Sequence, residues 1–248
     1  MKRSVVRPRY RLFVDLPLAA GQELALPDDQ LHYLRNVLRL RAGDALALFN
    51  GRDGEFSARI AVLERRRGSV LLQECLRRQK EGADIWLCAA LIRRSRFEWL
   101  AEKATELGVR RLIPLRTERS AGDRIRPDRL QAIMREAAEQ CERLDVPEIA
   151  PVQDLPAMLA SWDAGRSLHY CAERDQAAGC TFTPCGPAAI LIGPEGGFSS
   201  GEDQLLRQQK FVNPISLGTR ILRAETAALA ALSLWQAQAG DWRCATGG

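Results

Sequence analysis

Short runs of alternating apolar and polar residues fill the first third of the chain and predict a small β-rich domain. The runs have the length of single strands, and Asn50-Gly51 and Asp53-Gly54 turns separate two of them. Between the first two runs, residues 29–40 place apolar side chains at helical spacing, which predicts a short helix with one packed face. The predicted strands are residues 11–15, 45–50, 55–62 and 69–73, and the packed face comprises Leu31, Leu34, Val37 and Leu38. This pattern favours a small β-barrel that carries one helix.

A different pattern begins at residue 85, where apolar strands alternate with amphipathic helices. Helices are predicted from Ser95, from Pro127 and over residues 224–238. Ser95 with Glu98, and Ser199 with Glu202, have the spacing of N-terminal capping boxes, and Gly108 is expected to end the first of these helices. The predicted strands are residues 85–92, 110–115, 167–172, 188–192 and 212–217. This alternation predicts an α/β domain built around a parallel sheet.

Charge divides the chain at the same place as the hydrophobic pattern. Residues 1–80 carry about seven more Lys and Arg than Asp and Glu, whereas the remainder is close to neutral or slightly acidic. An arginine-rich domain favours a polyanionic partner such as RNA, because phosphate neutralisation dominates nucleic-acid affinity. The alternative is a solvated surface that only keeps the protein soluble.

The cysteines and histidines form no pattern of metal ligands. No Cys-x-x-Cys pair is present among the seven cysteines, and His32 and His169 are the only histidines. We therefore expect no metal, and reduced cysteines in a cytoplasmic protein. The first residues show no signal peptide and no later apolar run is long enough to cross a bilayer, so we expect no membrane attachment.

Two glycine-rich segments near the end of the chain carry the strongest chemical signal. The strand at 188–192 runs into Gly-Pro-Glu-Gly-Gly at residues 193–197, and the strand at 212–217 ends at Gly218. Glycine permits positive φ and a close approach of the backbone to a ligand. Two such turns side by side at the carboxyl ends of parallel strands form the crevice in which open α/β proteins bind small ligands. We therefore expect a bound cofactor at these turns.

Further motifs stand in a fixed order with these turns. They are His32 with Val37-Leu-Arg-Leu40, Lys103 to Val109, Arg119-Ser120, Glu136 to Gln140 with Arg143, residues 189–199 and residues 216–226. In this ordered set the chain resembles the ribosomal RNA small subunit methyltransferase E family of the SPOUT class, over approximately residues 9–235. The resemblance implies a PUA-like RNA-binding β-barrel domain at 1–76, a linker at 77–84, and a parallel-sheet α/β trefoil-knot methyltransferase domain at 85–248.

The resemblance also implies a reaction and its participants. Family members use S-adenosyl-L-methionine as methyl donor, without a metal, and methylate N3 of a uridine in 16S rRNA, uracil 1498 in the numbering of that RNA. The implied partners are 16S rRNA or the small ribosomal subunit, and a second copy of the chain in a homodimer formed through the knotted domain.

Individual residues acquire candidate roles from the resemblance. The implied donor contacts are Gly193, Glu195, Gly197, Leu217, Gly218, Ile221 and Leu222. Glu195 could hold its turn by accepting backbone N–H bonds. Arg223 could stabilise the developing anion and Glu225 could accept the imide proton, although Glu225 is also an ordinary acid at a helix start. The candidate RNA contacts are Arg11, His32, Arg35 and Arg39, of which His32 could simply be packed in its domain.

Two other functions stay open at this point, and one fold is excluded. A Rossmann protein would show Gly-x-Gly-x-x-Gly after an early strand, and no such run follows residue 92 or residue 115. The first open alternative is a SPOUT enzyme that methylates another RNA or another base atom. The second is a non-catalytic RNA-binding or ribosome-assembly protein of the same fold, which has no reason to bind a methyl donor.

Overall fold

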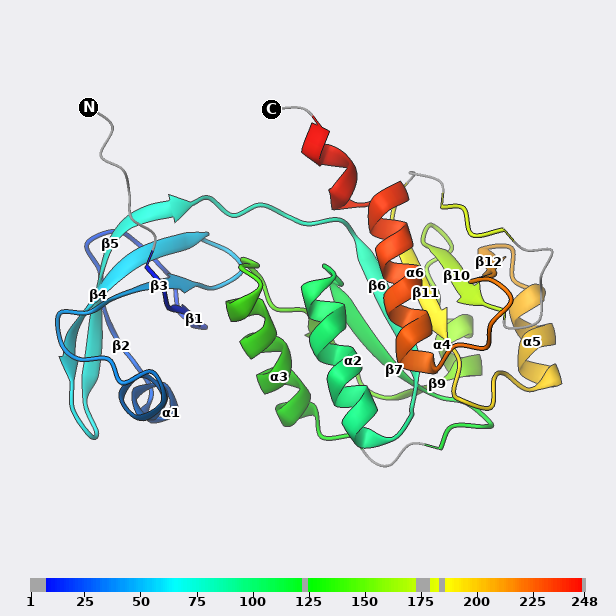
Figure 1. Cartoon of the computed structure of the whole chain (residues 1–248), viewed down its shortest axis with the longest axis horizontal. Coiled ribbons are helices and arrows are strands. Elements are labelled where there is room, and N and C mark those ends of the chain that lie inside the picture. The colour runs from blue at the N-terminus through cyan, green and yellow to red at the C-terminus, as the bar shows by residue number, and fades with distance from the viewer. Residues whose placement is uncertain (1–7, 122–124, 173–178, 183–185, 247–248) are drawn as a thin grey trace. The chain divides into compact units, whose positions relative to one another are not determined.

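The computed structural model describes residues 8–121, 125–172, 179–182 and 186–246. The chain separates into two compact units, which Figure 1 shows in the colours of their residue numbers. The first unit contains residues up to Glu81 together with Ala138–Asp145, and the second contains Gly82–Ala137 and the residues from Val146 onward. The short segment 138–145 therefore belongs with a part of the chain that precedes it by more than fifty residues.

The first unit is a five-stranded mixed sheet. The strands are β1 (Arg11–Phe13), β2 (Glu23–Ala25), β3 (Ala45–Phe49), β4 (Glu55–Leu63) and β5 (Gly68–Arg77), in the order β1-β3-β4-β5-β2. β1 runs parallel to β3, and the other pairs are antiparallel. Four of these strands were predicted, whereas β2 was missed. Leucines such as Leu24, Leu46 and Leu72 form the core of this unit.

The helix of the first unit differs from its predicted form. α1 (Asp28–His32) passes directly into a π-helical turn, η1 (Tyr33–Val37), in which the Leu38 N–H donates to the Tyr33 carbonyl five residues earlier. Leu31 and Leu34 are buried as predicted, but Val37 is 58% exposed. The prediction that Val37 packs in the core is wrong. A π-helical turn contains more residues than an α-helical turn, so Val37, three residues after the buried Leu34, does not lie on the same face of the helix as Leu34.

The second unit contains a parallel sheet of seven strands. They are β6 (Ile85–Ala90), β7 (Arg111–Arg116), β8 (Glu148–Ile149), β9 (Gln153–Asp154), β10 (Ser167–Cys171), β11 (Ala188–Ile192) and β12 (Val212–Ile215). Their order is β12-β10-β11-β6-β7-β8, and β9 pairs with the end of β7. All of these pairs are parallel. The predicted succession of a β-rich domain and a parallel α/β domain is confirmed.

Helices cover both faces of this sheet, as Figure 1 shows for α2 and α6 on the near face. The helices are α2 (Arg94–Glu106), α3 (Pro127–Gln140), α4 (Leu155–Ala160), α5 (Ser200–Arg207) and α6 (Ala224–Gln238), followed by a 3-10 turn, η2 (Asp241–Thr246). Side chains of α2, α6 and the first half of α3 pack with Leu87 and Ile190, whereas α4 and α5 pack with Cys88 and Leu191. Successive residues of one strand thus pack into different hydrophobic cores on the two faces of the sheet, because side chains alternate between the faces along a strand.

The two predicted capping boxes have different outcomes. At α5 the Ser199 hydroxyl accepts from the Glu202 N–H, and the Glu202 carboxylate accepts from the Ser199 N–H, so this box is confirmed. The box at Ser95 is wrong, because the N-cap of α2 is Arg93, two residues earlier, and it makes no side-chain cap hydrogen bond. The Glu98 carboxylate instead accepts from the guanidinium of Arg94. Arg94 lies four residues before Glu98 on the same helix face, so its guanidinium competes with the backbone N–H groups of the helix N-terminus for the Glu98 carboxylate.

Candidate functional site

A cavity of about 930 Å³ opens where β10, β11 and β12 end, within the second unit. Both glycine turns line it, but the sheet order places β10 between their strands, so the turns are not adjacent as the sequence suggested. The intervening strand contributes Tyr170, Cys171 and Ala172 to the wall. Sequence reasoning missed these three residues because no glycine marks this strand end and strand order is not encoded locally.

The first glycine turn has a conformation and a packing that require glycine. The Gly197 N–H donates to the Pro194 carbonyl, and Gly197 has a φ of 67°, a left-handed value that side chains disfavour. At Gly193 an added Cβ would lie 3.1 Å from Cε2 of Phe198. The Phe198 ring can therefore fold back over the end of β11, which shapes the floor of the cavity.

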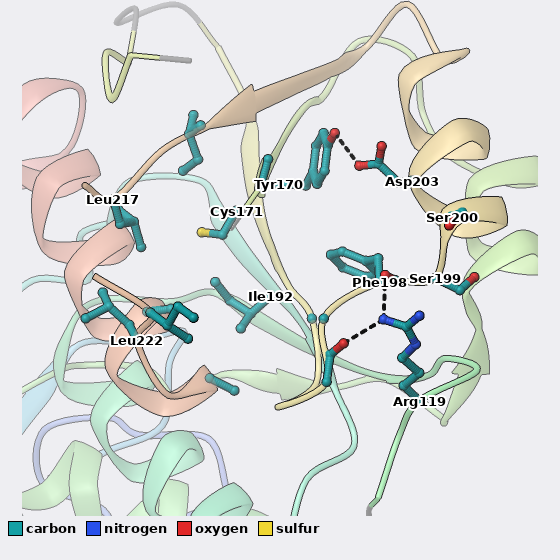
Figure 2. A pocket seen from close by; sticks show the side chains of 18 of the residues that line it. Arg119, Tyr170, Cys171, Ile192, Phe198, Ser199, Ser200, Asp203, Leu217 and Leu222 are labelled. Atoms are coloured by element: carbon teal, nitrogen blue, oxygen red, sulfur yellow. Dashed lines mark hydrogen bonds between the residues drawn. The ribbon is translucent and has the colours of Figure 1, made fainter. Parts of the chain in front are cut away.

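Side chains from other segments hold this turn in place. Nη1 of Arg119 donates to the carbonyls of Gly196 and Phe198 at 2.8 and 3.3 Å, as the dashed lines in Figure 2 show. The buried Glu202 carboxylate accepts from the Glu118 N–H at 2.9 Å in addition to its capping bond. The turn is thus fixed by the segment after β7 before any ligand binds, which reduces the ordering that binding would require.

The second glycine turn supplies the apolar side of the cavity. Leu217, Gly218, Ile221 and Leu222 all line it. Gly218 has a φ of 96°, and an added Cβ would meet no atom within 4 Å, so its backbone conformation rather than space requires glycine. Leu217 and Leu222 are partly buried against the core, whereas Ile221 is 82% exposed at the rim. An apolar ring could be enclosed between these side chains.

The opposite side of the cavity in Figure 2 is polar and comes from α5. The Tyr170 hydroxyl donates to Oδ1 of Asp203 at 2.9 Å, and Nε of Arg207 donates to Oδ2 of the same carboxylate at 2.8 Å. A cavity with one apolar wall, one charged wall and exposed backbone at two turns suits a ligand that combines a planar ring with charged groups.

Arg223 and Glu225 lie just behind the second turn, at the start of α6. Arg223 is the N-cap residue and is exposed, while Glu225 is buried with an exposed fraction of 9%. Oε1 of Glu225 lies 3.7 Å from Nε of Arg96, and its Oε2 has no hydrogen-bond partner among the described residues. Neither residue is part of the cavity wall, although Ala224 between them is. The structure therefore places the predicted pair next to the ligand cavity rather than inside it.

Glu195 is also not among the residues that line the cavity. Its carboxylate accepts from Nη1 of Arg96, and in the described part of the chain it accepts no backbone N–H. The turn is held by Arg119 and by its own Gly197 hydrogen bond instead. Arg96 had no role in the sequence reasoning, and its partners at residues 195 and 225 are too distant in sequence for a local pattern to reveal.

In the first unit, Arg11 is an internal structural residue. Nε of Arg11 donates to Glu55 at 2.5 Å, and the two Nη atoms donate to the carbonyls of Ala138, Glu139 and Arg143 at 2.9, 2.9 and 2.6 Å. The guanidinium also lies 4.4 Å from the ring centre of Phe49, and only 8% of the side chain is exposed. A phosphate could reach this group only after those bonds broke, so we infer that Arg11 stabilises the unit instead of contacting RNA.

The other candidate RNA contacts are accessible. His32 and Arg39 are exposed, and Arg35 is partly exposed with Nε donating to the neighbouring Asn36 side chain. Arg39 has a φ of 57°, which directs the chain away from the helix just before the buried Leu40. Across residues that the structure describes, no group of His, Cys, Asp and Glu could hold a metal ion. No helix among them is both long and apolar enough to cross a membrane.

Comparison with known proteins identifies both units. A family model described as an RNA methyltransferase domain matches residues 79–236, and one described as an RNA methyltransferase PUA domain matches residues 26–73. The chain is 34% identical over 227 residues to the ribosomal RNA small subunit methyltransferase E of Rickettsia conorii, covering 90% of this chain and 93% of the relative. It is 34% identical over 236 residues to the Synechocystis protein of the same name, covering 90% and 76%.

Solved structures agree with these relatives. The ribosomal RNA small subunit methyltransferase E from Neisseria gonorrhoeae, bound to S-adenosyl methionine, has a TM-score of 0.86 at 29% identity and covers 94% of this chain and 99% of its own. A methyltransferase from Legionella pneumophila in complex with SAM has a TM-score of 0.85 at 31% identity and covers 95% and 100%. The two matched domains and these full-length similarities show that the chain belongs to the ribosomal RNA small subunit methyltransferase E family.

Proposed function

We propose that the cavity binds S-adenosylmethionine and that the protein transfers its methyl group to N3 of a uridine in 16S rRNA, uracil 1498 in the family. The observation that carries this proposal is a cavity built from two glycine turns at parallel strand ends, with an apolar wall and a charged wall. Two structures that resemble this chain over nearly its whole length hold the same donor. An RNA-binding assembly protein without catalysis would not need such a cavity.

The donor contacts we propose are the glycine turns. Gly193 and Gly197 would bring backbone against the donor on one side, and Leu217, Gly218, Ile221 and Leu222 would enclose it on the other. Glu195 would act indirectly, since its carboxylate is bound by Arg96. In the trefoil knot of the SPOUT class the carboxy-terminal segment would thread through a loop, and this threading would keep both turns closed around the donor.

Methyl transfer to a uracil nitrogen requires removal of the imide proton as the N3–carbon bond forms and the sulfur–carbon bond breaks. Bound S-adenosylmethionine supplies an electrophilic methyl group and leaves as S-adenosylhomocysteine. Exposed Arg223 would stabilise negative charge on the uracil oxygens, a role that suits a permanent cation. Glu225 would accept the proton at Oε2, the oxygen that has no partner within the described chain.

The RNA would be held by the PUA domain through Arg35, Arg39 and His32, whose side chains are accessible. We further propose a cytoplasmic homodimer that pairs through the methyltransferase domain and acts on 16S rRNA or on the assembled small subunit. A SPOUT enzyme with another RNA target is the second candidate, because the donor cavity alone does not select a nucleotide.

Mass spectrometry of 16S rRNA from cells with and without the protein tests the reaction. We expect N3-methyluridine at position 1498 to disappear without the protein and to return with the wild-type chain. A methyl group lost from a different position would favour the second candidate. Calorimetry with S-adenosylmethionine separates both from a non-catalytic protein, which would show no binding.

Single-turnover methylation at saturating donor and RNA tests the catalytic pair. Arg223→Ala should lower the rate by about 10²-fold or more, since one lost contact to developing charge costs a few kcal/mol, while donor affinity changes far less. Glu225→Gln keeps the shape of the side chain but removes the proton acceptor. A wild-type rate and pH profile in Glu225→Gln would assign Glu225 to the helix start only.

A further inference from the structure

Arg96 occupies an unusual place for a cation, in the first turn of α2. Positive side chains are unfavourable at a helix N-terminus, where the macrodipole is positive, and this first turn contains no acid. The local sequence Arg93-Arg94-Ser95-Arg96 therefore does not serve the stability of α2. Arg94 is accounted for by its pair with Glu98, four residues later on the same helix. Arg96 is not, because both of its partners lie on other segments.

Those partners belong to the two segments that enclose the cavity. Nη1 of Arg96 donates to Oε1 of Glu195, which stands between Gly193 and Gly197 in the first turn. Nε of Arg96 lies 3.7 Å from Oε1 of Glu225, three residues after Leu222 of the second turn. One guanidinium thus bridges two turns that are linked along the chain only through α5 and β12.

We propose that Arg96 is a positioning residue that fixes the two donor-binding turns relative to each other by holding Glu195 and Glu225 on one guanidinium. The inference rests on the donor site proposed above. Glu195 and Glu225 carry like charges near one another, so without the cation they would repel and the turns would separate. A planar guanidinium has donors in a fixed fork and can engage two carboxylates at once, which a single ammonium group does less well.

The state of Glu225 supports this role. Only 12% of its side chain is exposed, and Arg96 is the cation that contacts it within the described residues. A largely buried carboxylate without its cation would draw in water or move outward. Oε1 faces Arg96, while Oε2 is buried and has no hydrogen-bond donor among the described residues, so Arg96 is the contact that holds this carboxylate in place.

Donor binding by the full-length protein tests the proposal. Calorimetry with S-adenosylmethionine should show about a tenfold loss of affinity in Arg96→Ala, which corresponds to about 1.4 kcal/mol. Arg96→Lys keeps the charge but not the fork, and should recover part of that loss. Glu195→Gln should weaken binding alone, yet add little in the Arg96→Ala background, because both changes break one bridge.

Arg94→Ala is the matched control, since Arg94 lies in the same turn of α2 and, among the described residues, forms its ion pair within that helix. It should bind donor like the wild type. In methylation assays Arg96→Ala should raise KM for the donor and lower kcat together, whereas mere instability would reduce the amount of active protein and leave KM unchanged. Wild-type donor affinity in folded Arg96→Ala or Arg96→Lys, or full additivity with Glu195→Gln, would overturn the proposal.

The proposed function can fail separately from this inference. If the wild-type protein binds S-adenosylmethionine but methylates no position of 16S rRNA, the reaction is wrong and the calorimetric comparison still tests the bridge. If the wild-type protein binds no donor, the donor site itself is wrong, and the bridge has no ligand to position.

Discussion

Replacing the buried cation of the first unit should destabilise that unit and leave RNA binding unchanged. We consider Arg11→Met, which keeps an apolar stem of similar length and removes the guanidinium. The change deletes one ion pair with Glu55 and three hydrogen bonds to backbone carbonyls. Because only 8% of the Arg11 side chain is exposed, water cannot easily replace these bonds.

The magnitude follows from these contacts. Removing one partner of a buried ion pair costs about 3–5 kcal/mol, and buried carbonyls that lose their donor add about 1 kcal/mol each. Glu55 keeps a second partner, since Nε of Arg77 donates to it at 2.7 Å, and Met restores some packing on Phe49. We therefore expect a loss of about 3 kcal/mol, and a fall in Tm of about 10 °C or more for a unit of this size.

Differential scanning calorimetry of the full chain measures this effect. Arg59→Met is the control, because Arg59 lies in β4 of the same sheet but its hydrogen bond to the Gly43 carbonyl is exposed. Its Tm should stay within about 2 °C of the wild type. RNA affinity of Arg11→Met, measured well below its transition, should equal that of the wild type. A variant with unchanged Tm and weakened RNA binding would refute the reasoning and make Arg11 an RNA contact.

Three further outcomes are expected. Gly197→Val should weaken donor binding in calorimetry by more than about tenfold, because its φ of 67° strains a β-branched residue, while Gly201→Ala within α5 should not; equal affinities would remove the turn from the site. Replacing Arg35 and Arg39 together by Ala should lower RNA affinity and flatten its salt dependence with donor binding intact; an unchanged salt slope would make them surface charges. Burial opposes ionisation of Glu55, but hydrogen bonds from two guanidinium groups hold its pKa below the usual value. The stability that ionised Glu55 contributes is therefore fully present above about pH 4.3, the pKa of a glutamate in the unfolded chain, and is lost as the pH falls through the lower pKa of the folded state. Thermal melts from pH 6 to pH 3 should show this loss in the wild type, and a Glu55→Gln variant that loses as much would contradict it.

Local patterns were sufficient for most elements of both units. The strand at 188–192 was found because five consecutive buried residues form its core, and the α5 start was found because Ser199 and Glu202 cap the same helix turn. The glycine turns were found because Gly197 and Gly218 have positive φ, a conformation that favours glycine over other residues and so leaves a mark in the sequence. Each of these signals involves residues a few positions apart. The π-helical turn at η1 escaped because the same apolar spacing fits an ordinary helix.

What the sequence by itself determined is therefore most of the elements, the two turns and, through the order of its motifs, the family. The tertiary structure decided which of these segments meet. It put β10 between the two turns, and it buried Arg11 against residues up to 132 positions away. It also joined Arg96 to Glu195 across 99 positions. Ion pairs of this kind depend on how sheets and helices pack, and a charged residue has the same local signature whether it faces solvent, RNA or a distant carboxylate.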